Sequence, residues 1–310
     1  MNVSLREPSA GHNRSPFAAE IERRRTFAII SHPDAGKTTL TEKLLLYAGA
    51  IELAGAVRGR NRRHATSDWM KLEQERGISI TAAALEFELQ GRRMSLLDTP
   101  GHQDFSEDTY RTLLAVDSVV MVLDAAKGVE PQTLKLFDVC RMRGLPVLTF
   151  INKLDQPARD PFELLDQIER VLGISAAPMN WPLGDGVDFR GVYDLERNAV
   201  LLYERQERGR RMAPIAMASP SDPEVTALIG ERRQDDLIAA VEMISGAGTR
   251  FDLDMYRAAK QTPVFFGSAL NDFGVEPFLR ALVALAPSPG PRVADTGTVD
   301  PTSAHFSGFI

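Results

Sequence analysis

Residues 31–40 read SHPDAGKTTL and directly follow four mostly apolar residues, 27–30, which favour a β-strand. A strand, a short loop ending in Gly-Lys-Thr and a helix are typical of a phosphate-binding loop, whose backbone N–H groups and helix dipole attract anions. The lysine reaches the terminal phosphates, and Thr38 is a predicted Mg²⁺ ligand. When this segment is taken alone, an ordinary turn between a strand and a helix is the alternative to a phosphate-binding loop. The predicted phosphate-binding residues are Ser31, His32, Pro33, Asp34, Ala35, Gly36, Lys37, Thr38 and Thr39.

The composition is that of an ordinary globular protein. The chain has 310 residues, 44% hydrophobic and 25% charged, so it can bury a substantial core. The single cysteine, Cys140, excludes a disulfide within the chain and favours a reducing compartment, which predicts a cytoplasmic protein. The sequence has no apolar run long enough to span a bilayer, and a net charge of -6 argues against nucleic-acid binding by the whole surface. We expect a monomer that binds neither DNA nor a membrane.

Short apolar runs typical of β-strands recur and alternate with helical patterns. This alternation predicts βαβ units, and hence an α/β fold of the P-loop NTPase type with a doubly wound, mostly parallel sheet flanked by helices. Apolar residues at helical spacing near positions 40–47 and 278–285 give each helix one face that can cover the sheet. The expected strands are residues 27–30, 94–97, 119–123, 147–151 and 264–267.

The domain organisation follows from where the alternation of strand and helix patterns stops. Residues 1–24 are polar and charged and are expected to form a disordered arm before the main α/β domain, which is expected at 25–286. Residues 157–262 interrupt the alternation with a helix, a predicted hairpin (191–195 and 199–203) and further helix, which predicts an inserted α+β subdomain. The proline-rich start of 287–310 is typical of a linker, and residues 306–310 are expected to be the first strand of a truncated second β domain.

Two further motifs follow predicted strands. Asp98, at the end of the run 94–97, can hold Mg²⁺, and the Asp-Thr-Pro-Gly segment lets a backbone N–H approach a γ-phosphate. Taken alone, the Asp-Thr-Pro-Gly segment is also a favourable turn sequence. Asn-Lys-Leu-Asp follows the run 147–151, and an Asp carboxylate there accepts two hydrogen bonds that guanine offers and adenine lacks. Further predicted phosphate contacts are Asp98, Thr99, Pro100, Gly101 and His102, and the predicted guanine contacts are Asn152, Lys153, Leu154, Asp155, Ser268, Ala269 and Leu270.

The order of these motifs predicts a GTP-binding site, because ligands of open α/β sheets bind outside the carboxyl ends of the strands. Two segments are expected to sense the γ-phosphate. Ser79, in Arg-Gly-Ile-Ser-Ile-Thr, is the predicted switch hydroxyl and Mg²⁺ ligand, and Thr81 competes for that role. His102 is placed to orient the attacking water and is the predicted catalytic residue. Asp155 disfavours an ATPase.

These motifs together resemble the translational GTPases, and within them the family of bacterial peptide chain release factor three. The stretches that carry the resemblance run from residue 30 to 39, 64 to 70, 76 to 81, 98 to 110 and 152 to 155. Elongation factor G is similar overall, but Ser-His-Pro at 31–33 fits the release-factor family better. The resemblance implies GTP hydrolysis on the ribosome, with Mg²⁺, that helps to remove the release factors that read stop codons.

Three functions stay open at this point. The first is a release-factor GTPase, the second another translational GTPase similar to elongation factor G, and the third a truncated guanine-nucleotide binding module without recycling activity. The basic run 58–64 suggests contact with ribosomal RNA phosphates, although a solvated loop accounts for it equally well. The hairpin of the predicted insertion suggests either a ribosomal protein contact or simple packing on the core.

Overall fold

The computed structural model describes residues 16–49, 83–98, 106–202, 219–246, 250–295 and 297–303. Several predicted features lie outside these residues: both candidate switch hydroxyls, the basic run 58–64, residues 99–102 with the predicted catalytic histidine, and the expected strand at 306–310. For Asp98 the structure describes the backbone as the end of a strand and not the side chain.

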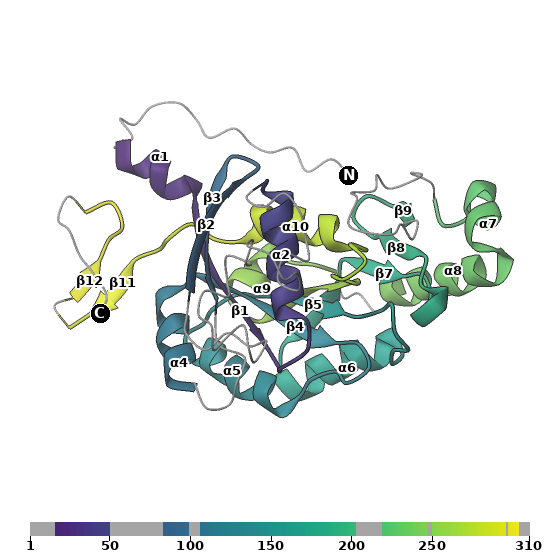
Figure 1. Cartoon of the computed structure of the whole chain (residues 1–310), viewed down its shortest axis with the longest axis horizontal. Helices are drawn as coiled ribbons and strands as arrows, with labels where there is room; N and C mark the ends of the chain where they lie inside the picture. The colour runs from purple at the N-terminus through teal and green to yellow at the C-terminus, as the bar shows by residue number, and fades with distance from the viewer. Residues whose placement is uncertain are drawn as a thin grey trace, which may run out of the picture.

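A seven-stranded sheet with the order β2-β3-β1-β4-β5-β10-β6 forms the centre of the molecule (Figure 1). Its neighbouring strands pair in parallel except for β2, which pairs antiparallel with β3. This confirms the predicted doubly wound α/β fold. The strands are β1 (Arg24–Ser31), β2 (Ala83–Leu89), β3 (Arg92–Asp98), β4 (Ser118–Asp124), β5 (Val147–Asn152), β6 (Ser175–Pro178) and β10 (Gln261–Phe266).

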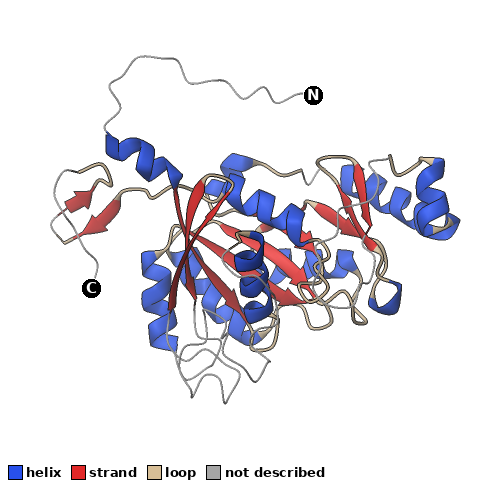
Figure 2. Cartoon of the chain, turned by 45° about the horizontal axis from the view of Figure 1, so that its top comes forward, coloured by secondary structure: helices blue, strands red, loops and turns tan. Residues whose placement is uncertain are grey.

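Helices cover both faces of this sheet, and Figure 2 shows them on either side of the strands. Alternate residues of β1 serve the two faces, because Phe27 and Ile29 join one buried cluster while Ala28 and Ile30 join the other. The first cluster lies under α2 (Lys37–Tyr47), α9 (Leu253–Arg257) and α10 (Val275–Leu285). The second lies under α4 (Ser106–Ala115), α5 (Pro131–Met142) and α6 (Pro161–Leu172).

A smaller antiparallel sheet extends the molecule at the β6 end (Figure 1). It contains β7 (Asn180–Pro182), β8 (Gly191–Asp194) and β9 (Ala199–Leu202), of which the last two form the predicted hairpin. Buried Asn180 joins it to the main sheet, since its side chain donates to the Phe266 carbonyl at 3.0 Å and accepts from the Phe266 amide at 2.7 Å. The remaining elements here are η3 (Gly186–Asp188), α7 (Pro223–Ile229) and α8 (Glu231–Gly246).

The predicted start of the insertion at residue 157 is wrong. Helix α6 packs on the main sheet, and β6 pairs in parallel with β10 at its edge, so the interruption of the main fold begins only after β6. The sequence of β6, Ser-Ala-Ala-Pro, has neither β-branched nor aromatic residues, and only its place beside β10 makes it a strand.

Both ends of the chain also differ from prediction. Residues Pro16–Arg23 form helix α1, within the arm expected to be disordered, and Arg23 pairs with both Glu20 and Glu88. After the prolines of the linker, β11 (Arg292–Ala294) and β12 (Gly297–Val299) form a hairpin that was not predicted from the sequence. Within the described part of the chain, no helix is long and apolar enough to cross a bilayer.

Candidate functional site

The loop between β1 and α2 has the backbone conformation of an anion-binding turn. Ala35 donates its N–H to the His32 carbonyl at 3.2 Å, and Asp34 and Gly36 adopt positive φ values of 63° and 102°. Gly36 occupies the N-cap of α2 and has no side chain to cap the helix. The first amides of α2 are therefore oriented toward the loop, where a phosphate group can accept their hydrogen bonds.

Asn152, the last residue of β5, joins the phosphate-binding loop to the loop after β10. Its Nδ2 donates to the Ala35 carbonyl at 2.8 Å, and its Oδ1 accepts from the Ala269 amide at 2.8 Å. The side chain is buried and spans 117 residues of sequence in each direction. It thus brings together segments that the sequence analysis assigned to opposite ends of one nucleotide.

The contact of the Asn152 side chain with the phosphate-binding loop requires glycine at position 36. A Cβ atom at Gly36 would lie 2.1 Å from Asn152 Nδ2, well inside any permissible contact, and its φ of 102° suits glycine alone. The glycine of the Gly-Lys-Thr motif is thus explained here by packing against Asn152 as well as by backbone conformation.

The predicted guanine-binding residues lie together at the carboxyl ends of β5 and β10, with one qualification. Ser268, which is buried, donates its hydroxyl to Asp155 Oδ1 at 2.6 Å, and this leaves Oδ2 of the carboxylate for another donor. Leu270 is exposed beside them, with 65% of its surface accessible. The side chain of Leu154, in contrast, is buried in the core, so that only its backbone belongs to the loop.

Lys153 has a partner that the sequence analysis missed. Its Nζ donates to Asp124 Oδ2 at 2.9 Å, from a backbone with a positive φ of 70°. Burial raises the pKa of Asp124, but the hydrogen bonds from Lys153 and the Ala126 amide, with the charge of Lys153, outweigh burial and leave the pKa below its usual range. A signal was present, because Asp124 ends β4 as Asp98 ends β3.

His32 in the phosphate-binding loop also has an unforeseen neighbour. Its Nε2 lies 3.3 Å from Glu130 Oε1, and Lys127 Nζ lies 3.7 Å from the same oxygen. Glu130 is the N-cap of α5. No sequence signal beyond Asp124 at the strand end pointed to this segment, so only the fold reveals the contacts of Glu130.

The residues predicted to hold Mg²⁺ are consistent with that ion where the structure describes them. Thr38 lies in the first turn of α2, and Asp98 ends β3 with its backbone paired to Ile29 of the adjacent β1. Hydroxyl and carboxylate oxygens are hard ligands of the kind Mg²⁺ prefers. Lys37 is buried at the start of the same helix, and Thr39 is half-buried beside it.

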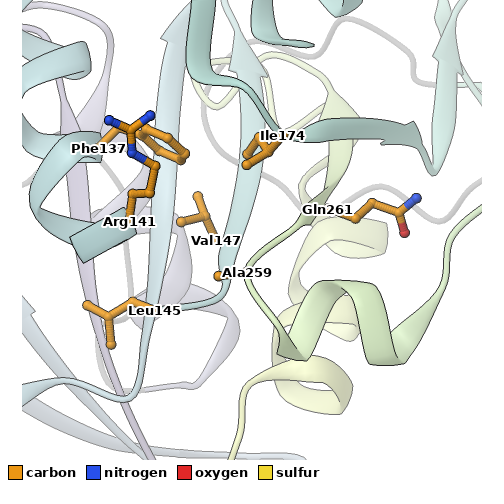
Figure 3. A pocket seen from close by; sticks show the side chains of 7 residues that line it. All are labelled: Phe137, Arg141, Leu145, Val147, Ile174, Ala259 and Gln261. Atoms are coloured by element: carbon orange, nitrogen blue, oxygen red, sulfur yellow. The ribbon is translucent and has the colours of Figure 1, made fainter. Parts of the chain in front are cut away.

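Two cavities lined by described residues lie away from the phosphate-binding loop. Figure 3 shows a small cavity between α5 and the amino-terminal ends of β5 and β10, at the sheet edge opposite the phosphate-binding loop. A larger cleft of about 600 Å³ lies between residues 181–188 and α8. Neither is lined by residues 31–39 or 152–155. The side chains around the small cavity are Phe137, Arg141, Leu145, Val147, Ile174, Ala259 and Gln261.

This fold, with a glycine-lysine loop between its first strand and helix, is that of a P-loop nucleotide-binding protein. The family profile described as Elongation factor Tu GTP binding domain matches residues 22–288, and the chain belongs to this family.

Its relatives confirm the resemblance to release factor three. The chain is 58% identical to "Peptide chain release factor 3" of Gloeobacter violaceus over 95% of its length, covering 56% of that protein. It is 55% identical to the protein of the same name from Symbiobacterium thermophilum, again over 95% of this chain and 56% of the relative. The chain thus spans about half the length of these curated relatives.

A crystal structure of a protein from Thermus thermophilus has a similar fold. The TM-score is 0.66 at 25% sequence identity, and the match covers 88% of this chain and 44% of that one.

Proposed function

We propose that the chain binds GTP and hydrolyses it to GDP on the ribosome, and that this turnover promotes the removal of the release factors that read stop codons. The observation that carries the nucleotide-binding part is Asn152, whose side chain joins the phosphate-binding loop to the loop of Ser268 and Ala269. A single nucleotide can span these two loops. The termination part rests on the names of the relatives that the chain matches.

In the proposed complex the guanine base lies between Lys153 and the loop after β10. Asp155 accepts hydrogen bonds from guanine N1–H and the 2-amino group, while Ser268 holds the carboxylate through its other oxygen. The stem of Lys153 lies over the ring. The Ser268 and Ala269 amides donate to the Phe273 carbonyl and to Asn152 Oδ1, so the Leu270 amide is the donor proposed for guanine O6. Adenine would leave the Asp155 carboxylate without its donors, which disfavours ATP.

At the phosphate end, the loop 31–39 and the Lys37 side chain bind the β- and γ-phosphates. Thr38, Asp98 and Ser79 would hold Mg²⁺, which neutralises phosphate charge when bound. His102 is proposed to orient the attacking water, together with γ-phosphate contacts from 99–101. Phosphoryl transfer requires mainly positioning and charge stabilisation, so a strong base is not needed.

The proposed GTP site is tested by the nucleotide that the purified protein carries. Denaturing the protein and separating the released small molecules is expected to yield GDP or GTP. If the protein is purified empty, GDP with Mg²⁺ should raise the melting temperature, since a ligand that binds only the folded state stabilises it by mass action. ADP at the same concentration serves as the control, and an equal shift with ADP would refute guanine selectivity.

The proposed role of the second switch predicts a separation of binding from turnover. In His102→Ala the affinity for GDP should stay near that of the unchanged protein, because GDP lacks the γ-phosphate that the attacking water approaches. Ribosome-stimulated, single-turnover hydrolysis should fall by at least about a hundredfold. Normal stimulated hydrolysis in this variant would reject the role of His102.

A second candidate function is a guanine-nucleotide binding module without recycling activity, which the contacts of Asn152 between the two loops would serve equally well. Hydrolysis assays with and without ribosomes distinguish the two, because the module would bind GTP without stimulation. A translocase similar to elongation factor G is the third. We place the proposed activity in the cytoplasm, with the ribosome as the partner of a monomer.

We also propose a domain organisation for the chain. A GTPase domain ends near residue 286, after α10, and the segment from 287 onward leads into a second β domain. Residues 180–246, rather than the full range expected from the sequence, form the inserted subdomain.

A further inference from the structure

The turn after β4 lies against both halves of the candidate nucleotide site. Asp124 at its start contacts Lys153 of the base-binding loop, and Glu130 at its end contacts His32 of the phosphate-binding loop. No nucleotide role was expected of this turn, which we define as residues 124–130. Its two contacts raise the question of whether it positions the groups that meet the ligand.

Asp124 is held by its own backbone before it contacts Lys153. Its Oδ1 accepts from the Ala126 amide at 2.9 Å, and its carbonyl accepts from the amides of Lys127 and Gly128 at 3.1 and 2.7 Å. The carboxylate therefore has one oxygen committed to the turn. The second oxygen, Oδ2, faces the Lys153 ammonium.

The same turn is anchored to the rest of the fold on two sides. The Ala125 amide donates to the Asn152 carbonyl at 2.9 Å, and Arg159 donates its Nε to the Ala126 carbonyl at 3.1 Å. Gly128, at φ 73°, lies so close to Gln167 of α6 that a Cβ there would be 2.0 Å from Gln167 Oε1. Such a turn keeps Asp124 at a constant position relative to β5.

The ion pair with Asp124 determines which part of the Lys153 side chain can contact a ligand. The Asp124 side chain has only 6% of its surface accessible and that of Lys153 25%, so the pair is formed in a largely desolvated place where it is stronger than at the surface. With its ammonium held by Asp124, Lys153 is restrained at both ends, and its apolar stem is the part left to lie against a ligand.

We propose that Asp124 is a positioning residue for guanine recognition, which holds the Lys153 side chain in the conformation that packs on the base before the nucleotide arrives. This inference rests on the proposed function, because it assumes that guanine occupies the loop of 152–155. Asp124 itself touches no part of the nucleotide. Its effect on affinity comes from ordering Lys153 in advance, so that binding loses less side-chain entropy.

The test measures the affinity for GDP, with Mg²⁺, by titration calorimetry of the full chain. Asp124→Asn retains the oxygen that caps Ala126 and removes the charge that holds Lys153, so GDP should bind about tenfold more weakly. GTP should weaken by the same factor, since the change affects the base and not the phosphates. A loss for GTP alone would contradict the proposal.

The double variant separates positioning from a general structural effect. In a Lys153→Ala background, Asp124→Asn should cause no further loss of affinity, because the group that it positions is already absent. An equal tenfold loss in both backgrounds would show that Asp124 acts independently of Lys153 and would overturn the inference. Asp138→Asn, which breaks the exposed pair with Arg141 on α5, is the matched control and should bind GDP normally.

A second variant covers the case in which Asp124→Asn does not fold. Lys153→Met keeps the apolar stem and removes the ammonium, so it breaks the same pair from the other side and should also weaken GDP binding about tenfold. Wild-type affinity in Lys153→Met would overturn the positioning role. Failure of the unchanged protein to bind GDP would instead overturn the proposed function, so the two failures are distinguishable.

Discussion

Asp155→Asn is expected to convert the guanine site into one that prefers xanthine. Ser268 can still donate to the amide oxygen in place of Asp155 Oδ1, so the substituted side chain keeps its orientation. Its Nδ2 then stands where Oδ2 stood, and a donor there opposes guanine N1–H and the 2-amino group while it suits the 2-oxo group of xanthine. Loss of a buried hydrogen-bonded match of this kind should lower the GDP affinity by at least about a hundredfold.

The measurement is a competition between GDP and xanthosine diphosphate for the same preparation of protein, with melting temperature recorded alongside. Asp166→Asn is the matched control, since Asp166 lies on α6 with 73% of its side chain accessible and pairs with Arg170 one turn away. It should show unchanged guanine preference. Undiminished preference in Asp155→Asn as well would mean that the base is read elsewhere.

Gly36→Ala is expected to abolish measurable nucleotide binding and to destabilise the fold. The added methyl would lie 2.1 Å from Asn152 Nδ2, and a non-glycine residue at φ 102° is strained in addition. To relieve the overlap, Asn152 must leave the Ala35 carbonyl or the Ala269 amide, both of which are buried contacts. We expect a loss of about 2–4 kcal/mol in the free energy of unfolding and of at least about a thousandfold in GDP affinity.

Denaturant unfolding and GDP titration of the same variant measure both effects. Gly49→Ala is the matched control, because Gly49 has a positive φ of 71° just after α2, yet no described atom lies within 4 Å of a Cβ built there. That variant isolates backbone strain, which should cost about 1 kcal/mol and leave GDP binding intact. If the two variants behave alike, the contact with Asn152 is not what requires glycine at position 36.

Much of the fold was predictable because its signals are local. The runs that predicted strands in the sequence are the central strands of the sheet. The elements that the sequence did not predict share one cause. β6 is a strand only because β10 lies beside it, and α1 pairs its charges with a strand whose Glu88 follows Arg23 by 65 residues. Neither relation leaves a pattern in the nearby sequence.

The features of the candidate site likewise divide into those that local sequence predicts and those that it does not. Residue types and their order after strands predicted a phosphate-binding loop, a guanine loop and a Mg²⁺ acid, because a chemical group and its position at a strand end are both local properties. The structure joins the first two loops through Asn152, and the ligands of all three stay predictions. The roles of His102, Ser79 and Thr81 stay predictions, since these residues lie outside the described part of the chain.

What the sequence alone determined is therefore the chemistry that each loop can offer and the class of fold that presents it. Only the tertiary structure decided which groups meet: Asn152 between Ala35 and Ala269, and Asp124 against Lys153. These partners are separated by 29 to 117 residues. Hydrogen bonds over such distances depend on how the sheet orders its strands, and that order follows from packing of the whole core rather than from any one segment.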